Sequence, residues 1–523
     1  MRVIFFFLIL TTTIQCAQQP NVAAVNLLGS NDCDYTFPVT MDGQTFNMIV
    51  DTGSSNFAVA AVGCSTCTGI TPLFNGTLTT TPIEVDYGSG AIAGKIADNV
   101  LFSISGSSTT LSATMDIMGI TAQSTFFNCG NQTQGIVGMA YPPLSVDELP
   151  IAMDMLSSLD NVPNGFALQL CAGIAGADSA SKTGNMYLGG WPSKFATGPM
   201  QYIAITQPEY YNVQIMGFTV SGSPVTLPDD INDPLSIVDS GTTQMIINTG
   251  ANCLAIRNAL ENSDIITWSD YLSPTDIEHF WESLVSIEEG FYTINENFQM
   301  TIDFLGTHGE TVSIAIPPMN WFEVAPNGVG VNYLTFTGLA NCAYDNSLTI
   351  VGETLFTNYI VFFDRGIGQR IGFAPSKDCF NATQDSDIDN YASGFHDCTN
   401  LDNETLAELQ QCQAEHGCSG STNNKKKKRA LVANELVETC NELRCNVFCY
   451  QQIGCLNSFK ANCTSILSHL PGCTVNCNGS SKPNGPDLLF AAIISIILVM
   501  RIFGLSHIEE LLSEGIYVIF GFN

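Results

Sequence analysis

The pattern of hydrophobic and polar positions between about residues 33 and 373 predicts a body built mainly of strands. Short apolar or alternating runs are separated by residues typical of turns. Residues 37–50 contain two such runs around Asp42-Gly43, which predicts a β-hairpin. Helical spacing is sparse, with candidates at residues 148–159, 251–261 and 276–286. We therefore expect a mostly-β body of about 350 residues, long enough for two lobes.

Composition narrows the class of protein. The chain has 523 residues, of which 45% are hydrophobic, so a core can form and general disorder is excluded. Acidic residues number 49 and basic residues 17, which gives a formal net charge of −32. Nucleic acid would repel such a chain, so we expect no nucleic-acid partner. Protonation of carboxylates relieves this self-repulsion, so tolerance of acid is expected.

The N-terminal segment places the chain in the secretory pathway. Met1-Arg2 precedes an apolar run at residues 3–10 and small residues at Cys16-Ala17, which predicts a signal peptide over residues 1–17. Its removal leaves 18 of the 19 cysteines, an even number that suits disulfide formation in an oxidising lumen. Six glycosylation sequons agree with this compartment: Asn75, Asn131, Asn381, Asn403, Asn462 and Asn478.

A second apolar run, residues 488–505, predicts a membrane anchor. Its uninterrupted part, residues 488–500, is short for a bilayer, but Arg501 can snorkel and let the span continue. We expect a single-pass segment preceded by a stalk at residues 478–487 and followed by a tail at residues 506–523. The alternatives are a GPI signal, since small residues and a polar spacer precede the run, and a soluble protein with an apolar terminal helix.

Composition changes after Phe380. Residues 381–397 are polar and acidic and predict a linker. Residues 398–477 carry ten cysteines and predict a disulfide-rich module, because the lumenal setting disfavours the alternative of zinc binding. The basic run at residues 425–429 is interpreted as a solvated loop, with a processing site or a contact to acidic polymers as alternatives.

An internal repeat carries the chemistry. Ile49-Val-Asp51-Thr-Gly-Ser-Ser recurs as Ile237-Val-Asp239-Ser-Gly-Thr-Thr, 188 positions further on. Each copy is followed by an apolar-apolar-Gly motif, ending at Gly138 and at Gly352. A pair of unrelated Asx turns at strand ends would give the same residues singly, but not this doubled arrangement.

Two carboxylates on matching turns of a duplicated fold can face each other across a pseudo-twofold axis. At hydrogen-bond distance they share one proton, and their two macroscopic pKa values split apart. The ionised member can then deprotonate a water molecule, and the protonated member can polarise a carbonyl group. Gly53 and Gly241 permit close backbone approach, and the hydroxyls of Ser54 and Thr242 can orient the carboxylates.

These motifs resemble those of the pepsin-like aspartic proteases over roughly residues 34–379. The resemblance implies the bilobal pepsin-like fold, catalytic Asp51 and Asp239, and buried Thr52 and Ser240 beneath them. It also implies that no metal or other cofactor is needed. The family more often has Thr at both buried places, so Ser240 is a mild departure. With this family, the N-terminal lobe is expected over residues 18–200 and the C-terminal lobe over residues 201–380.

The resemblance extends to the substrate cleft. Tyr87-Gly88-Ser89-Gly90 is similar to the flap that closes over a bound peptide, and Ile136 and Tyr210 are further candidates for substrate contact. Residues 359–365 and 370–374 resemble the terminal strand pair of the second lobe. The family's usual Trp after the first Asp motif is missing.

Phe57-Ala-Val stands where that Trp is usually found, as in the membrane-anchored β-secretases. Similarity to the same branch around Leu168-Gln-Leu-Cys171 suggests a disulfide between Cys171 and Cys342.

The function expected from these features is hydrolysis of extended peptides with apolar side chains at the cut. Its setting would be the cell surface or an acidic endosomal or lysosomal compartment. The alternatives are a catalytically inactive protein of the same fold that binds peptides or glycans, and an adhesion protein whose working part is the cysteine-rich module. A serine or cysteine protease is disfavoured, because His279 and His308 are the only histidines of the β-rich body and neither lies in a catalytic motif.

Overall fold

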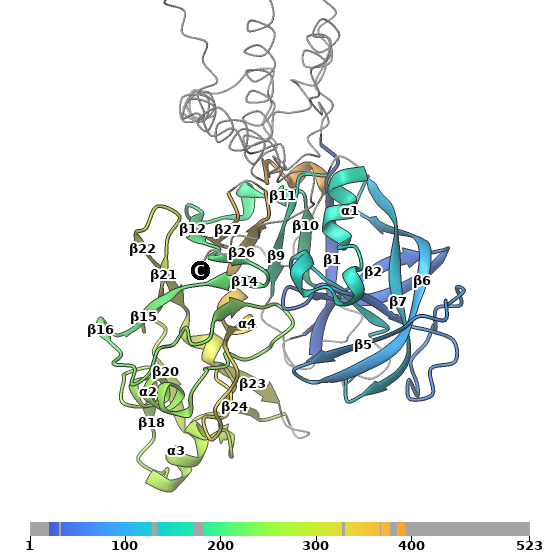
Figure 1. Cartoon of the computed structure of the whole chain (residues 1–523). Helices are drawn as coiled ribbons and strands as arrows, with labels where there is room; N and C mark the ends of the chain where they lie inside the picture. The colour runs from blue at the N-terminus through green and yellow to red at the C-terminus, as the bar shows by residue number, and fades with distance from the viewer. Residues whose placement is uncertain are drawn as a thin grey trace, which may run out of the picture. The chain divides into compact units, whose positions relative to one another are not determined.

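The computed structural model of this chain describes residues 20–30, 33–127, 133–159, 162–171, 182–326, 330–366, 368–376 and 384–392. All of them belong to one compact unit, built mainly of strands as expected (Figure 1). The predicted signal peptide, cysteine-rich module, basic run, stalk, apolar segment and tail lie outside the described residues, as do all the sequons except Asn75. In the part that is described, no helix is long and apolar enough to cross a membrane.

One large sheet organises the first half of the chain. Thirteen strands pair in the order β12-β27-β26-β9-β10-β1-β2-β3-β8-β4-β7-β6-β5. The strands from the first half are β1 Ala23–Ser30, β2 Cys33–Met41, β3 Gln44–Asp51, β4 Phe57–Ala60, β5 Pro82–Tyr87, β6 Gly90–Ser105, β7 Thr110–Ser124, β8 Gly135–Gly138, β9 Gly165–Leu170 and β10 Lys182–Leu188. The predicted hairpin is confirmed, since β2 and β3 pair around Asp42 and Gly43, both with positive φ.

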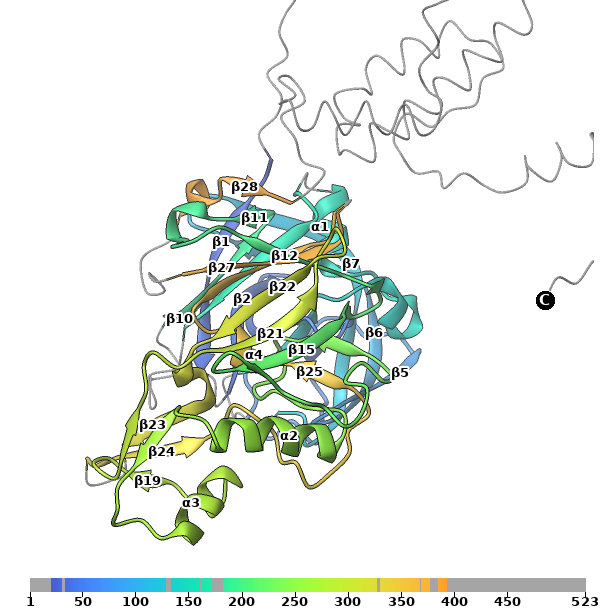
Figure 2. The same cartoon turned by 90° about the vertical axis from the view of Figure 1, so that its left-hand side faces the viewer.

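The second half forms smaller sheets. These contain β11 Gly190–Trp191 with β28 Asn390–Tyr391; β13 Gln207–Pro208, β14 Tyr211–Val213, β17 Ser236–Val238 and β25 Thr349–Val351; β15 Ile215–Val220, β16 Ser223–Pro224, β21 Met300–Leu305 and β22 Thr311–Ile316; β18 Ile266–Trp268 with β20 Tyr292–Ile294; and β19 Ile287–Glu288, β23 Phe322–Pro326 and β24 Asn332–Phe336. Figure 2 shows β15, β21 and β22 side by side.

The predicted terminal strand pair is present but sits elsewhere than expected. β26 Tyr359–Asp364 and β27 Arg370–Pro375 pair with each other, and β12 Gln201–Ala204 extends them. β26 also pairs with β9, so this part of the second half completes the large sheet of the first half. Its residues are buried on both faces, which places a shared core between the two halves.

The helices follow the predicted segments with shifted ends. α2 Gly250–Glu261 matches closely, and the Thr249 side chain caps it by accepting from the Asn252 N–H. α1 Ala152–Leu159 starts later than predicted, because Asp147 and Glu148 have positive φ. α3 Pro274–Trp281 begins at a capping box and stops before Ser283, whose φ is 58°. A short helix, α4 Glu353–Phe356, follows β25.

The predicted disulfide between Cys171 and Cys342 is wrong. Cys342 is bonded to Cys253 in α2, with Cα atoms 5.3 Å apart, and Cys171 takes part in a different disulfide. The loop that carries Cys342 packs on the first turn of α2, where a bridge closes without moving the backbone. A second described bridge joins Cys64 and Cys67.

Part of the predicted linker is folded. Residues 384–392 form a short 3-10 turn, Asp385–Asp387, and β28, which pairs with β11. Ile388 and Ala392 are buried in an apolar cluster with Trp191. The nine residues 384–392 therefore pack against the main body of the chain.

Candidate active site

The two repeated Asp motifs occupy equivalent places in the fold. β3 runs parallel to β8, which pairs Val50 with Val137, and β17 runs parallel to β25, which pairs Val238 with Val351. In both cases the apolar-apolar-Gly motif is the parallel neighbour of the strand that ends in Asp. A buried strand therefore delivers each carboxylate to the start of a turn.

The turns hold the two carboxylates in the same way. The Gly53 N–H donates to Asp51 Oδ1 at 2.8 Å, and the Gly241 N–H donates to Asp239 Oδ1 at 2.8 Å. Ser54 Oγ donates to Asp51 Oδ2, and Thr242 Oγ1 donates to Asp239 Oδ2. Each carboxylate thus accepts a backbone N–H and a hydroxyl. The predicted orienting roles of Ser54 and Thr242 match these contacts.

Thr52 and Ser240 tie the two turns together. The Thr52 N–H donates to Ser240 Oγ at 3.1 Å, and the Ser240 N–H donates to Thr52 Oγ1 at 2.8 Å. Thr52 Oγ1 then donates to the Val238 carbonyl, and Ser240 Oγ donates to the Val50 carbonyl. Both side chains are buried, so no water competes for these bonds. The result is a closed, twofold-like set of four hydrogen bonds between the strands that carry the two Asp residues.

The two glycines bring each turn against the opposite carboxylate. A Cβ added at Gly53 would lie 2.5 Å from Asp239 Cγ, and one added at Gly241 would lie 2.4 Å from Asp51 Oδ1. Burial, and next the charge of Asp239, raise the pKa of Asp51 well above its usual range, although Ser54 and Gly53 donate to it. Two carboxyl groups this close favour a state with one proton between them.

The predicted flap is a hairpin with Tyr87 at its tip. Tyr87 pairs with Gly90 across the turn at Gly88-Ser89, and Thr125 Oγ1 donates to the Ser89 carbonyl. Burial raises the pKa of Tyr87, and the charge of Asp51 adds to the rise, so the phenol lies near the first carboxylate. The nearby Ser54 hydroxyl lowers this pKa in part, but the buried Tyr87 hydroxyl makes no well-aligned hydrogen bond among the described residues. Phe57, which stands where the family usually has Trp, has no N–H to donate to this hydroxyl.

Phe126 is a residue that the motif search missed. Its ring lies 4.9 Å from that of Tyr87, centroid to centroid, and is only 6% exposed. Ile136 is buried in the same apolar cluster, against which Tyr87 packs. The signal for Phe126 was an aromatic pair directly after β7, but sequence alone does not place this pair under the flap.

Two polar residues also lie near the dyad. Burial raises the pKa of half-buried Tyr210, and the charges of Glu209, Asp239 and Asp51 add to it, which agrees with its predicted place in the cleft. Burial also raises the pKa of Asp34, with a further contribution from Asp239. Asp34 was not predicted as a site residue, because one acidic residue at a strand start is uninformative in so acidic a chain.

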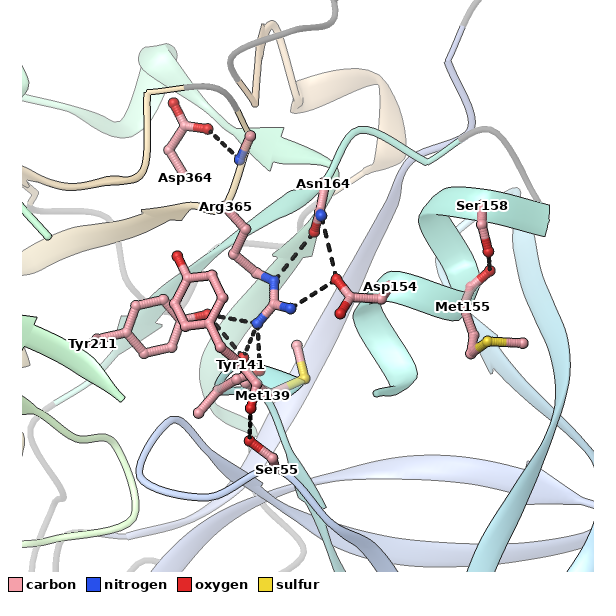
Figure 3. A network of polar contacts seen from close by, with 12 residues as sticks. Ser55, Met139, Tyr141, Asp154, Met155, Ser158, Asn164, Tyr211, Asp364 and Arg365 are labelled. Carbon is pink, nitrogen blue, oxygen red and sulfur yellow. Dashed lines mark hydrogen bonds and ion pairs between the residues drawn. The ribbon is translucent and has the colours of Figure 1, made fainter. Parts of the chain in front are cut away.

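A buried cation supports the first Asp turn from behind (Figure 3). Arg365 donates through Nη1 to the carbonyls of Met139 and Ala140, and through Nη2 to Asp154 Oδ1 at 2.7 Å. Tyr211 Oη also donates to the Met139 carbonyl, at 2.8 Å. The Met139 N–H in turn donates to the Asp51 carbonyl. Arg365 therefore links the end of β26, helix α1 and the turn that follows Gly138.

The described residues contain no group of three or more His, Cys, Asp or Glu arranged to hold a metal ion. The chemical groups that converge here are two coupled carboxylates, their hydroxyl and backbone donors, and a tyrosine over them. Such a site can activate a water molecule and polarise a carbonyl group without a metal. It therefore defines a protein of the acid-dyad hydrolase class.

Comparison with known proteins agrees with this class. The family model described as eukaryotic aspartyl protease matches residues 35–376, and the chain belongs to that family. It is 24% identical to beta-secretase of Strongylocentrotus purpuratus over 363 residues, 64% of this chain and 64% of that protein. It is 29% identical to cathepsin D of Clupea harengus, over 64% of this chain and 78% of that protein. Cathepsin E of Aquarana catesbeiana is 26% identical, over 68% of this chain and 83% of that protein.

Proposed function

We propose that this protein is an aspartic endopeptidase in which Asp51 and Asp239 activate a water molecule between them. The observation that carries the proposal is the twofold-like equivalence of the two turns, with each carboxylate held by one N–H and one hydroxyl. The raised pKa of Asp51 supports a proton shared between the two carboxyl groups. The ionised carboxylate takes a proton from the water, and the protonated one donates to the peptide carbonyl, so attack forms a tetrahedral intermediate.

Collapse of that intermediate reverses the proton flow. The carboxyl group that gained a proton from water passes it to the departing nitrogen, and the C–N bond breaks. As the C=O bond re-forms, a hydroxyl of the intermediate gives its proton back to the other carboxylate, so the dyad is again singly protonated. The four hydrogen bonds that join the turn of Thr52 to the turn of Ser240 hold the two carboxylates at a fixed separation during both steps. This pre-organisation lowers the cost of reaching the transition state.

The substrates that we propose are extended peptides with bulky apolar residues at the cut. The flap places Tyr87 against the buried apolar cluster of Phe126 and Ile136, so the wall of the cleft is apolar on this side. A strand-like peptide can be held through its backbone while alternate side chains enter such pockets. Gly88 at the tip borders open space, which leaves room for this approach, whereas Gly90 lies close against the Ser124 carbonyl of β7.

We further propose that the enzyme works in the secretory pathway or in an acidic compartment reached from it, held at the membrane by residues 488–505. The acidic composition and the two described disulfides support an oxidising and acid-tolerant setting. The glycosylation of Asn75, which is exposed, is part of the same proposal.

The experiment that tests the function is hydrolysis of a quenched peptide with two adjacent Leu residues, by purified full-length protein. Activity should appear in the acidic range and disappear in Asp51→Asn and in Asp239→Asn. Peptide binding without cleavage by the unaltered protein would instead favour a catalytically inactive binding protein.

A further inference from the structure

A hollow in the second half of the chain has the features of a ligand site. Its volume is about 320 Å³, and its wall is formed by α2, the end of α3, the end of β24 and the loop around Cys342. None of its lining residues belongs to the Asp turns or to the flap. α2, α3 and β24 lie in the same region of the molecule in both views (Figures 1 and 2).

The hollow is held in a fixed shape by covalent and hydrogen bonds. The disulfide between Cys253 and Cys342 joins the first turn of α2 to the loop. Ser283 Oγ, just past α3, donates to the Phe336 carbonyl at the end of β24 at 2.8 Å. The Ala340 N–H donates to the Met245 carbonyl at 2.9 Å. The disulfide thus fixes α2 to the loop, and the Ser283 bond fixes the end of α3 to β24.

Two N–H donors that belong to lining residues have no acceptor among the described residues. They are Arg257 Nε and the indole Nε1 of Trp281, whose residue is only 2% exposed. A buried donor without an acceptor costs free energy, so most such groups in proteins find a partner. Arg257 also makes no ion pair in the described part of the chain, whereas Arg365 and Arg370 each pair with an Asp. In a protein of net charge −32, an unpaired cation in a hollow is a marked feature.

The rim of the hollow is apolar. Leu254 is 37% exposed and Leu284 is 65% exposed, and Leu254 lies three residues before Arg257, on the same face of α2. Exposed leucines beside a cation and an indole donor match a ligand with an apolar body and a negatively charged head. The glutamate in the lining, Glu282, opposes such a ligand by its charge.

We propose that this hollow binds a small carboxylate with an apolar body, the chemistry that an apolar residue presents at the C-terminus of a peptide. The carboxylate accepts from Arg257 and Trp281, and the apolar part covers Leu254 and Leu284. A charge-assisted bond to an arginine is among the stronger polar contacts in proteins. The proposal does not depend on the dyad, because the lining contains no residue of the active site.

Titration calorimetry at pH 5.5 tests it, where a free carboxylate is ionised. The full chain, carrying Asp239→Asn so that no peptide is cut, is titrated with N-acetyl-leucyl-leucine, with its C-terminal amide and with octanoate. We expect the peptide acid to bind about tenfold more tightly than the amide, as one charged hydrogen bond is worth roughly that ratio. The affinities of octanoate and of the peptide acid are compared. Tighter binding of octanoate indicates a fatty acid as the ligand, and tighter binding of the peptide acid indicates a peptide C-terminus.

Matched variants locate the binding. Arg257→Gln should weaken the peptide acid about tenfold and abolish its advantage over the amide. Lys95→Gln, which removes an exposed charge from β6, should change neither affinity. Trp281→Phe should cause a smaller loss, and Glu282→Gln should tighten binding. If neither acid binds, or if Arg257→Gln leaves the affinity of the bound acid unchanged, the proposal is wrong.

Discussion

Thr52 and Ser240 exchange backbone-to-hydroxyl hydrogen bonds across the pseudo-twofold axis, at 3.1 and 2.8 Å. Because each hydroxyl also donates to the strand before the opposite Asp, a change at either residue alters the placement of both carboxylates. The two residues 188 positions apart therefore act as one unit.

Ser240→Ala removes one hydroxyl from this unit. It leaves the buried Thr52 N–H and the Val50 carbonyl without partners, which costs about 1–3 kcal/mol of folding free energy. Since small misplacements of catalytic groups are expensive, kcat should fall roughly tenfold or more, with KM little changed. Steady-state kinetics and urea unfolding measure both effects. Ser240→Thr keeps the hydroxyl and serves as the control; equal losses in both variants would show that the hydroxyl is not what matters.

The flap gives a second prediction. The Tyr87 ring packs on Phe126, whereas its buried hydroxyl has no partner among the described residues. Tyr87→Phe should therefore keep the fold at least as stable and retain most activity, while Tyr87→Ala should lower turnover on a peptide substrate. Thermal unfolding and kcat/KM provide the readouts. Unchanged kinetics in Tyr87→Ala would remove this residue from the site.

Arg365 provides a third prediction, for stability and catalysis together. It is 4% exposed and bonds to two carbonyls behind the first Asp turn and to Asp154. Replacing it with Met leaves the Ala140 carbonyl without this donor, whereas the Met139 carbonyl keeps Tyr211 Oη and Asp154 keeps Asn164 Nδ2. The loss of a partner by a buried polar group costs about 1–3 kcal/mol. Asp154→Asn should cost less, because that side chain is 34% exposed. Urea midpoints measured side by side test this order, and the reverse order would contradict it.

The sequence predicted what is local and duplicated. The Asp turns and the hairpin that carries Tyr87 depend on short motifs, and both are present at the predicted residues. The parallel pairing of the apolar-Gly motifs with the Asp strands was not predicted. The pairing of Cys342 with Cys253 depends on how a loop packs on α2, which no spacing reveals. β26 was predicted to belong to the second lobe, but it pairs with β9 in the large sheet. The sequence of a strand does not show which strand it pairs with.

The linker prediction failed over residues 384–392 for a similar reason. Its acidic composition suggested a solvated chain, but Asp385 accepts from the N–H groups of Ala24, Ser107, Ser108 and Thr109 and from the Ser108 hydroxyl. The N–H groups that donate to Asp385 come from segments far from it in the sequence, near Ala24 and near Ser108. Composition therefore cannot distinguish such an anchored Asp from a solvated one.

Asp385 leads to a prediction about pH. Burial raises its pKa, but the donors of Ala24, Ser108 and Ser107 outweigh burial and lower it to about 2. A carboxyl whose pKa is lower in the folded than in the unfolded state stabilises the fold above its unfolded value, near 4, and loses this effect as the pH falls towards 2. Asp385→Asn should cost about 2 kcal/mol between pH 7 and 4. Unfolding curves should show this difference shrink below pH 4; a difference that grows there would contradict the assignment.

The pH profile of peptide hydrolysis by the unaltered protein and by Asp239→Asn tests the central claim most directly. A dyad that needs one charged and one protonated carboxyl gives a bell-shaped rate on the acidic side, which declines towards neutral pH as the shared proton leaves. Asp239→Asn removes the titrating group in a nearly isosteric way, so the variant should still fold. Its rate should fall by several orders of magnitude, since acid–base catalysis alone contributes roughly 10²–10⁴-fold. The rate of hydrolysis is measured for both proteins between about pH 3 and 8. Retained cleavage by the variant, or a rate for the unaltered protein that rises steadily to the upper end of this range, would contradict the account.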